Sequence, residues 1–426
     1  MRRKRAIGLL ITAVLIAATA PIAPSLAAPG DNAVVQWNET ALTIITTDAT
    51  RSTPSAASLY VAITQLAVYD AVMAIAGTHE PYAYDGDAPG ASLDAAVATA
   101  ARDVLVNYFP SSASSLDGPS GTYTTALAAI PDGPAKDAGI AVGHNAAQTI
   151  IALRANDGRN ASVPEPPNGT EPGQWRRTGS NPSAPAVTPY VAQVTPFLVD
   201  SPDQFRAKGP NKLSSHAYAV QFERTLLYGA KNGSLRDEEQ TEIALFWTEN
   251  TVRQYNRALR GLAVERGLSI EDTARLFAMT DAPAADAMIT CWNTKYHYLA
   301  WRPITAINNA DTDGNPHTTK PEQPWEPLSV TGLHPEYVSG HACLTGAITR
   351  GLREFLGTKD INLTITFVSS TLTLEPRTYS TIEDLQTEVE DARVYGGDHW
   401  ESGGVDGTIL GDDLAKAALH DYFGEI

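Results

Sequence analysis

The segment Lys295-Tyr-His-Tyr-Leu-Ala-Trp-Arg302-Pro303 ends a helical pattern that begins at Ala284. Its final proline cannot continue a helix, because proline lacks the backbone N–H that the helix needs. Lys295 and Arg302 are seven residues apart, which on one helix separates them by only about 20° of rotation. Trp292 lies one turn before Lys295. The segment therefore predicts a helix with cations and an aromatic ring along one side, although by itself it also fits an ordinary solvated helix face.

Two later segments add histidines and further polar groups. Ser339-Gly340-His341 precedes an apolar helical pattern, and serine is favoured at a helix start. The free backbone N–H groups at such a start can bind an anion. Arg393-Val-Tyr-Gly-Gly-Asp-His399 carries its Arg and His on different faces of a straight helix. The paired glycines favour a bend that would let both side chains reach one point, and a simple helix end is the alternative.

The three segments together predict a site for a tetrahedral oxyanion. They provide one Lys, two Arg, a hydroxyl group and two His. Three fixed cations can neutralise a trianion such as phosphate or vanadate, and planar Arg forks match its oxygens. Each residue also has an ordinary structural explanation, so the prediction depends on the convergence of the three segments in the fold.

Helical patterns dominate the rest of the chain, so the predicted fold class is all-α, with two packed helical bundles. Residues 158–203 contain nine prolines and little periodicity, and we interpret them as a Pro-rich crossing loop. The loop ends an N-terminal half, 28–203, and a C-terminal half, 204–426, carries the site. Alternation in residues 361–367 is consistent with a small β-hairpin. The predicted helices are 32–48, 55–76, 92–109, 134–157, 214–228, 237–264, 269–279, 284–301, 339–356, 380 to about 393, and 408–423.

The N-terminus has the pattern of a cleavable signal peptide, 1–27. Four basic residues precede a short apolar run, and small residues lead to a predicted cleavage site after Ala27. An uncleaved anchor is the alternative. Cleavage would leave 27 basic and 48 acidic residues, a balance of −21 in place of −17. We therefore expect a secreted protein without a membrane or nucleic-acid partner, because so acidic a chain repels both.

Two weaker features accompany the cationic segments. Cys291 and Cys343 are the only cysteines, and a secreted chain could bridge them, with free buried cysteine as the alternative. The second feature imitates a calcium loop, but a proline stands where such loops need glycine, so a polar turn is the alternative. Its candidate oxygen ligands are Asp311, Asp313, Asn315 and Glu322.

The order and spacing of the three segments resemble a known signature. Lys-x6-Arg-Pro, then Ser-Gly-His, then Arg-x5-His is shared by type 2 phosphatidic acid phosphatases, bacterial acid phosphatases and vanadium-dependent haloperoxidases. The intervals also match, with 34 residues between Pro303 and Val338 and 50 between His341 and Ala392. The resemblance spans residues 291–407. The N-terminal half is similar, more loosely, to the secreted all-helical haloperoxidase branch.

The resemblance implies a vanadate cofactor and a role for each motif residue. His399 would bond the vanadium axially, His341 would move protons as hydrogen peroxide binds, and Lys295 would assist the attack of halide. Vanadium would act as a Lewis acid that polarises the peroxide. The implied activity is oxidation of halide to hypohalous acid, which halogenates a small organic substrate. The residues that would hold the vanadate oxygens are Lys295, Arg302, Ser339, Gly340 and Arg393.

Two other functions fit the same residues. In a secreted acid phosphatase, His399 would attack phosphorus and His341 would protonate the leaving oxygen, because vanadate mimics phosphate. A non-catalytic anion-binding protein is the third interpretation, and the intact residue set argues against it. Trp292 and His334 match the halide side of the haloperoxidases, where His334 favours bromide. Core packing and a loop turn are their structural alternatives. The sequence leaves homo-oligomerisation open.

The chain departs from the family signature at three positions. Val338 replaces the usual proline before the Ser-Gly-His segment, and Ala392 replaces the usual serine before the Arg-x5-His segment. Gly403 stands where many members carry an Asp, four residues after the second histidine. The carboxylate that orients His399 is therefore expected elsewhere. The candidates are Asp398, Glu401 and Asp406.

Overall fold

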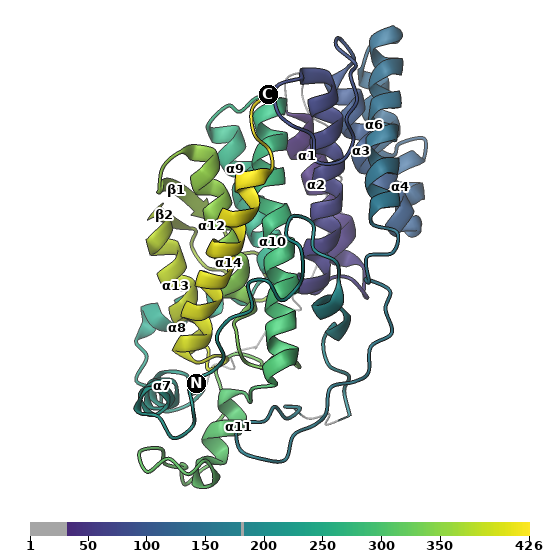
Figure 1. The fold of residues 1–426 in the computed structure, drawn as a ribbon. Coiled ribbons are helices and arrows are strands. Elements are labelled where there is room, and N and C mark those ends of the chain that lie inside the picture. The colour runs from purple at the N-terminus through teal and green to yellow at the C-terminus, as the bar shows by residue number, and fades with distance from the viewer. Residues whose placement is uncertain (1–31, 180–182) are drawn as a thin grey trace, which may run out of the picture. The chain divides into compact units, whose positions relative to one another are not determined.

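A computed structural model describes residues 32–179 and 183–426 (Figure 1). These residues are mainly helical and contain one two-stranded sheet, which confirms the all-α class. The predicted signal peptide lies outside them. The elements are α1 (Ala33–Thr47), α2 (Pro54–Ala76), α3 (Leu93–Tyr108), η1 (Pro110–Ser112), α4 (Ala113–Asp117), α5 (Thr122–Ala129), α6 (Pro134–Leu153), η2 (Pro189–Gln193), α7 (His216–Tyr228), α8 (Glu238–Phe246), α9 (Thr251–Glu265), α10 (Ile270–Tyr298), α11 (Pro303–Asn308), η3 (Ala310–Thr312), α12 (Gly340–Leu356), β1 (Asp360–Ile365), β2 (Arg377–Thr381), α13 (Ile382–Tyr395) and α14 (Glu401–Asp421).

Helix α10 is the central element of the fold. It packs against α2 of the N-terminal half and against α12 and α14 of the C-terminal half (Figure 1). Buried side chains from both halves join in one apolar core around it. The sequence predicts two helices here, 269–279 and 284–301, but the structure has one helix that includes Pro283. That prediction was wrong because packing around α10 outweighs the single backbone hydrogen bond that a proline removes.

Other helix boundaries also differ from the sequence-based prediction. The predicted helix 237–264 is divided into α8 and α9, because the Asn250 side chain accepts hydrogen bonds from two N–H groups and caps a new helix start. Helix α14 begins at Glu401, before the predicted start at 408, because the glycines in its first turns weaken the apolar pattern. The short helices α4, α5 and α11 carry too little periodicity to be predicted.

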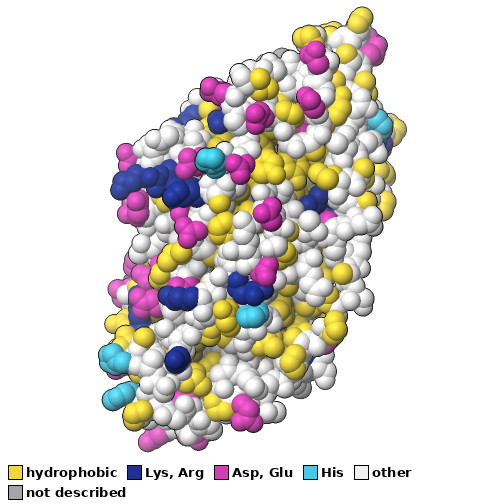
Figure 2. Space-filling model, viewed as in Figure 1, with side chains coloured by type: hydrophobic (Ala, Val, Ile, Leu, Met, Phe, Trp, Pro, Cys, Tyr) yellow, Lys and Arg dark blue, Asp and Glu magenta, His cyan; other side chains and the backbone are white. Residues whose placement is uncertain are grey.

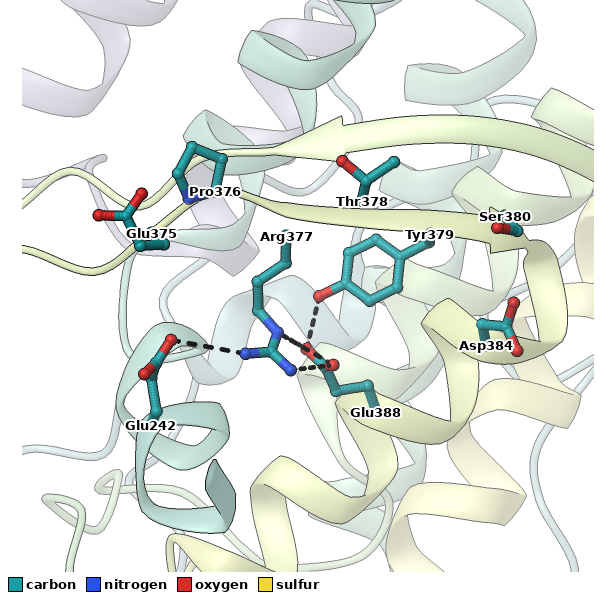
Figure 3. A pocket seen from close by; sticks show the side chains of 9 residues that line it. All are labelled: Glu242, Glu375, Pro376, Arg377, Thr378, Tyr379, Ser380, Asp384 and Glu388. Carbon is teal, nitrogen blue, oxygen red and sulfur yellow. Dashed lines mark hydrogen bonds and ion pairs between the residues drawn. The ribbon is translucent and has the colours of Figure 1, made fainter. Parts of the chain in front are cut away.

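The predicted hairpin is present as the antiparallel strands β1 and β2. A hollow of ≈ 360 Å³ lies beside β2 (Figure 3). Arg377 points into it and pairs with Glu242 at 3.6 Å and Glu388 at 2.9 Å, and the Tyr379 hydroxyl donates to Glu388. Through these pairs Arg377 holds the hairpin against Glu242 of α8 and Glu388 of α13. None of the residues that line this hollow belongs to the three cationic segments.

The Pro-rich crossing loop lies against helix α10. The Val187 carbonyl oxygen accepts hydrogen bonds from Trp292 Nε1 at 3.2 Å and from the Tyr296 hydroxyl at 2.8 Å. The buried carboxylate of Asp286 accepts a hydrogen bond of 2.6 Å from the N–H of Phe197. The loop therefore covers the C-terminal part of α10, where the first cationic segment begins.

Helices α12 and α14 approach each other closely because both carry glycine at their contact. A Cβ on Gly346 would lie 2.2 Å from the Thr408 carbonyl oxygen, and one on Gly411 would lie 2.1 Å from the Cys343 carbonyl oxygen. Such separations are far inside van der Waals contact, so a larger residue would push the helices apart. The close packing fixes the start of α12 against α14.

A buried polar chain links α1, α9 and α10. Arg260 donates to Asn38, Asn38 donates to Asn256, and Asn256 donates to Asp281 Oδ1 at 2.9 Å. Within the described residues, Asp281 Oδ2 has no hydrogen-bond partner. Burial raises the pKa of Asp281 to about 7, despite the hydrogen bond from Asn256 and the charge of Arg260. The folded protein therefore favours the protonated acid.

Asp281 is expected to make the protein less stable as pH rises from 5 to 8. Its folded pKa exceeds the unfolded value, so its contribution is complete below the unfolded pKa and is lost as pH rises through about 7. Asp281→Asn should remove roughly 1–3 kcal/mol of this pH dependence. Urea unfolding at several pH values measures it, with the exposed Asp413→Asn on α14 as the control. An unchanged slope in Asp281→Asn would contradict the assignment.

Helix α2 is long and apolar enough, by length and composition, to span a membrane. In the fold, 89% of its most apolar 18-residue segment is buried, as is typical of a core helix. The face in Figure 2 shows small groups of Lys and Arg interspersed with Asp and Glu. These exposed charges contrast with the buried cations of the predicted site.

Candidate oxyanion site

The three cationic segments meet around the loop 332–339, which leads into α12. Helix α10 ends at Tyr298, Leu299 adopts a left-handed conformation (φ 49°), and Arg302 becomes the N-cap of α11. The prediction that Lys295 and Arg302 share one helix face was therefore wrong. Both side chains nevertheless contact the same loop, so the chain turn at Leu299 replaces helical spacing as the cause of their convergence.

Arg302 is the centre of the hydrogen-bond network at this site. Its guanidinium is buried, and Nε donates to the His334 carbonyl oxygen at 2.9 Å. One terminal nitrogen donates to the Asp398 carbonyl oxygen at 2.9 Å and lies 3.0 Å from His399 Nε2. The other lies 2.9 Å from the His334 ring. The planar guanidinium therefore joins the loop at His334 to His399. A lysine has no planar fork and could not make both contacts.

Lys295 fixes the loop through its backbone. The buried ammonium donates to the carbonyl oxygens of Pro335 and Glu336, both at 3.0 Å, and to that of Val338. An ammonium has three N–H donors, and these contacts use all three. Lys295 thus brings its charge to the site while its donors hold the loop that enters α12.

The Ser-Gly-His segment forms the start of α12, as predicted. Ser339 is its N-cap, Gly340 is its first residue, and the Ser339 hydroxyl oxygen is buried without a hydrogen-bond partner in the described part of the chain. His341 Nε2 is likewise buried and unpartnered among those residues, while the other side of the ring bonds to the Trp247 backbone. A helix start with a free hydroxyl and a free ring nitrogen is suited to an anionic ligand.

The Arg-x5-His segment bends at its glycines, as predicted. Helix α13 ends at Tyr395, and Gly397 has φ +76°, where a Cβ would lie 2.6 Å from a neighbouring carbonyl oxygen. The turn brings the His399 N–H to 3.3 Å from the Arg393 carbonyl oxygen. Arg393 pairs with the buried carboxylate of Asp398, and in the described structure its Nε has no partner.

His399 is oriented by a glutamate that the sequence did not reveal. His399 Nδ1 lies 2.9 Å from Glu336 Oε1, and both side chains are buried. Because Glu336 Oε1 already accepts a hydrogen bond from the Trp400 N–H, it is also the acceptor in this contact, which assigns the proton to Nδ1. The lone pair of Nε2 then faces Arg302. Glu336 therefore sets both the tautomer and the direction of the ring.

The three carboxylates expected to orient His399 have other partners. Asp398 pairs with Arg393, Glu401 pairs with Arg224 at 3.0 Å, and Asp406 accepts from the Tyr337 hydroxyl at 2.9 Å. That prediction was wrong because all three candidates lie close to His399 in the sequence, whereas Glu336 lies in the loop before α12. The indirect signal was Gly403, because a Cβ there would lie 2.4 Å from Glu336 Oε1.

Burial and the clustered cations keep the site histidines neutral. Burial, followed by the charges of Arg302 and Lys295, holds the pKa of His399 well below its ordinary value. Burial and the charge of Arg393 do the same for the pKa of His341. Burial also lowers the pKa of Lys295 to about 8 and raises that of Glu336 to about 7. An oxyanion would offset the cationic field and so favour proton uptake by the histidines.

Trp292 and His334 lie together at one side of the site. Their ring centroids are 5.0 Å apart, and the Lys295 ammonium is 5.6 Å from the Trp292 ring centroid. Gly340 packs under Trp292, where a Cβ would lie 3.1 Å from the indole ring. The two residues that the sequence assigned to the halide side are therefore neighbours of Lys295 and of the α12 start.

The two weaker sequence features have protein partners in this structure. Cys291 and Cys343 are buried free thiols, and Cys291 Sγ donates to the Val338 carbonyl oxygen at 3.7 Å. In the candidate calcium loop, Asp313 accepts from the Thr318 hydroxyl and Asp311 pairs with Lys320. No group of three or more His, Cys, Asp or Glu that could hold a metal ion occurs in residues 32–179 and 183–426. The loop is built as a polar turn.

The fold and site define a helical protein with a buried cationic cradle next to two histidines. Residues 275–424 match the family model of the VCPO second helical-bundle domain. The vanadium chloroperoxidase of Curvularia inaequalis is 26% identical over 215 residues, which cover 41% of this chain and 34% of that protein. These matches show that the C-terminal half of the chain is similar to vanadium haloperoxidases. The aligned region thus spans about a third of the length of the curated relative.

Two solved structures share the fold over nearly the whole chain. The first bacterial vanadium-dependent iodoperoxidase has a TM-score of 0.75 at 21% identity, covering 92% of this chain and 96% of its own. A holo-type bacterial vanadium-dependent chloroperoxidase has a TM-score of 0.69 at 18% identity, covering 92% and 97%. At these identities the likeness concerns the architecture, and both halves of this chain take part in it.

Proposed function

We propose that this protein is a secreted vanadium-dependent haloperoxidase that oxidises halide with hydrogen peroxide. One observation carries the proposal: His399 is buried with Nδ1 bonded to Glu336, which directs Nε2 into a cationic cradle. The Ser339 hydroxyl and His341 Nε2 add two buried polar atoms that are unpartnered among the described residues. The relatives named above are vanadium enzymes, which supports vanadate over other oxyanions.

The residues present fit vanadate. His399 Nε2 is the nitrogen that would bind the metal, and Arg302 and Arg393 carry charges that would balance the oxyanion. The Ser339 hydroxyl and the Gly340 N–H are placed to donate hydrogen bonds at the α12 start. When bound, vanadate supplies a Lewis acid that polarises hydrogen peroxide toward attack by halide. Lys295 keeps the loop rigid and contributes its charge on the side of Trp292.

His341 is the residue that we propose to move protons. Its neutral ring bonds to the Trp247 backbone on one side, which leaves Nε2 as a proton acceptor. A neutral histidine whose Nε2 is buried beside an oxyanion can take a proton from hydrogen peroxide and return it to a leaving oxygen. Burial and the nearby cations hold the pKa of the His341 imidazole low, which favours release of that proton.

The finer specificity is also part of the proposal. Trp292 and His334 would form the halide side, and His334 favours bromide, because it provides a polar ring next to Arg302 where the resemblance associates chloroperoxidases with a phenylalanine. The product would be hypobromous acid, which halogenates a small organic substrate. The predicted signal peptide supports export, and the net charge of −17 fits a protein without a nucleic-acid or membrane partner.

A secreted acid phosphatase is the second candidate, because the same contact would serve its chemistry. The Glu336–His399 pair would also prepare Nε2 as a nucleophile toward phosphorus, with His341 as the acid for the leaving group. The same cradle would hold phosphate, so vanadate would then act as an inhibitor. A non-catalytic anion binder would use the cradle without either reaction.

One purified sample, divided between two assays, tests the proposal. One half receives bromide, hydrogen peroxide and a brominable phenol dye, with and without orthovanadate, and the other receives a chromogenic phosphate ester. We expect vanadate-dependent bromination and negligible ester hydrolysis. Ester hydrolysis that vanadate inhibits, without bromination, would assign the cradle to phosphate. The absence of both reactions, with vanadate still bound, would identify an anion-binding protein.

A further inference from the structure

Glu336 and Gly403 form a matched pair at the back of His399. Glu336 Oε1 accepts hydrogen bonds from His399 Nδ1 at 2.9 Å and from the Trp400 N–H at 3.2 Å. A Cβ on Gly403 would lie 2.4 Å from this same oxygen and 3.3 Å from the glutamate Cδ. The carboxylate therefore fits only because residue 403 has no side chain.

The geometry also shows what a side chain at position 403 could supply. Bond lengths and angles place the carboxylate oxygens of an aspartate about 2.4 Å from its Cβ. Glu336 Oε1 lies at this distance from the ideal Cβ position of residue 403. An aspartate at 403 could thus put an oxygen where Glu336 Oε1 now accepts from His399. The two positions are alternative sources of one carboxylate oxygen.

The loop that carries Glu336 is held on both sides. The Glu336 N–H donates to the Ala300 carbonyl oxygen at 2.9 Å, and its carbonyl oxygen accepts from the Lys295 ammonium at 3.0 Å. The Ser339 N–H donates to the Gly403 carbonyl oxygen at 2.8 Å, which ties the loop to α14. The position of Glu336 relative to Gly403 is therefore fixed by backbone contacts as well as by the carboxylate.

We propose that Glu336 is the positioning residue for His399 and that its carboxylate can be exchanged for an aspartate at position 403. The inference rests on the proposed function in one respect, that His399 Nε2 is the atom that contacts the oxyanion. It applies equally to a peroxidase and to a phosphatase. Glu336 acts through His399: it keeps the proton on Nδ1, so Nε2 carries no proton and is the ring nitrogen that could bind the ligand in place of its contact with Arg302.

A set of four variants tests the exchange by vanadate binding to the full-length apo-protein, measured by calorimetry. Glu336→Ala is expected to weaken binding about 10- to 100-fold, which is typical for loss of a group that orients a metal ligand. Gly403→Asp alone should also weaken binding, because two carboxylates would occupy one place. Adding Gly403→Asp to Glu336→Ala should restore most of the affinity, whereas adding Gly403→Asn should restore less. Ring-nitrogen NMR of labelled histidine should report the same order in the Nδ1–H tautomer of His399.

The outcomes separate this inference from the proposed function. A folded double variant with aspartate that binds vanadate no better than Glu336→Ala would overturn the exchange, as would equal recovery with asparagine. If the double variants fail to fold, Glu336→Gln decides, because it keeps the shape and removes the charge; affinity equal to wild type would overturn the role of the carboxylate. Bromination assays on the wild type fail or succeed independently of these binding results.

Discussion

Replacing His399 with alanine is expected to abolish vanadate-dependent turnover, with a loss of at least about a thousandfold. The change removes the nitrogen that would bind the metal and leaves the Glu336 carboxylate and the Arg302 fork without their shared partner. Calorimetry should show the loss of tight vanadate binding, and circular dichroism should show an unchanged helical fold. A phosphatase would lose its nucleophile, so ester hydrolysis would fall in the same variant.

The matched control for this variant is His420→Ala. His420 is an exposed histidine on α14 whose side chain pairs with Asp421. Its removal should leave vanadate binding and turnover unchanged. Turnover by His399→Ala at the level of the control would exclude His399 from both proposed reactions, even if the cradle still bound vanadate.

Arg302→Lys is expected to weaken vanadate binding about 10- to 100-fold, although it conserves the charge. The guanidinium now bonds to the loop at His334, to the Asp398 carbonyl oxygen and to His399. An ammonium has no planar fork and cannot hold these groups in one plane. A titration of the apo-protein with orthovanadate measures the effect, and bromide oxidation should fall with it.

Arg224→Lys provides the control for the same chemical change. Arg224 is a partly exposed arginine in the C-terminal half that pairs with Asp391 and Glu401. We expect its substitution to change vanadate affinity less than about twofold, because such exposed pairs contribute little. Equal affinities for Arg302→Lys and Arg224→Lys would show that the cradle needs only a positive charge at position 302, not a guanidinium.

Most helices were predictable because their apolar periodicity and their caps are local properties of the sequence. Two boundaries were predicted wrongly, for different reasons: the sequence predicts a break near Pro283 that the structure lacks, and it misses the break near Trp247. At Pro283 the packing of α10 against both halves overrides a local helix breaker. At the second break the apolar pattern of 237–264 continues across the join, and the cap at Asn250 decides the boundary.

The residues of the cradle were predictable because their types and order, together with the family resemblance, identify the chemistry. Their placement was predictable only in part. The bend at Gly396 and Gly397 followed from glycine, whereas Arg302 reaches the site through a left-handed turn that helical spacing could not indicate. Glu336 escaped prediction because it lies 63 residues from His399 in the sequence and joins it only in the fold.

The most direct measurement of the central claim is an orthovanadate titration of the phosphate-free protein, with bromide oxidation by hydrogen peroxide as the signal. The account predicts that activity rises from background, saturates at one vanadate per chain and is reversed by competing phosphate. The cradle provides one nitrogen ligand, His399 Nε2, and buried cations to hold a single oxyanion. Saturated vanadate binding without any bromide oxidation would contradict the haloperoxidase assignment.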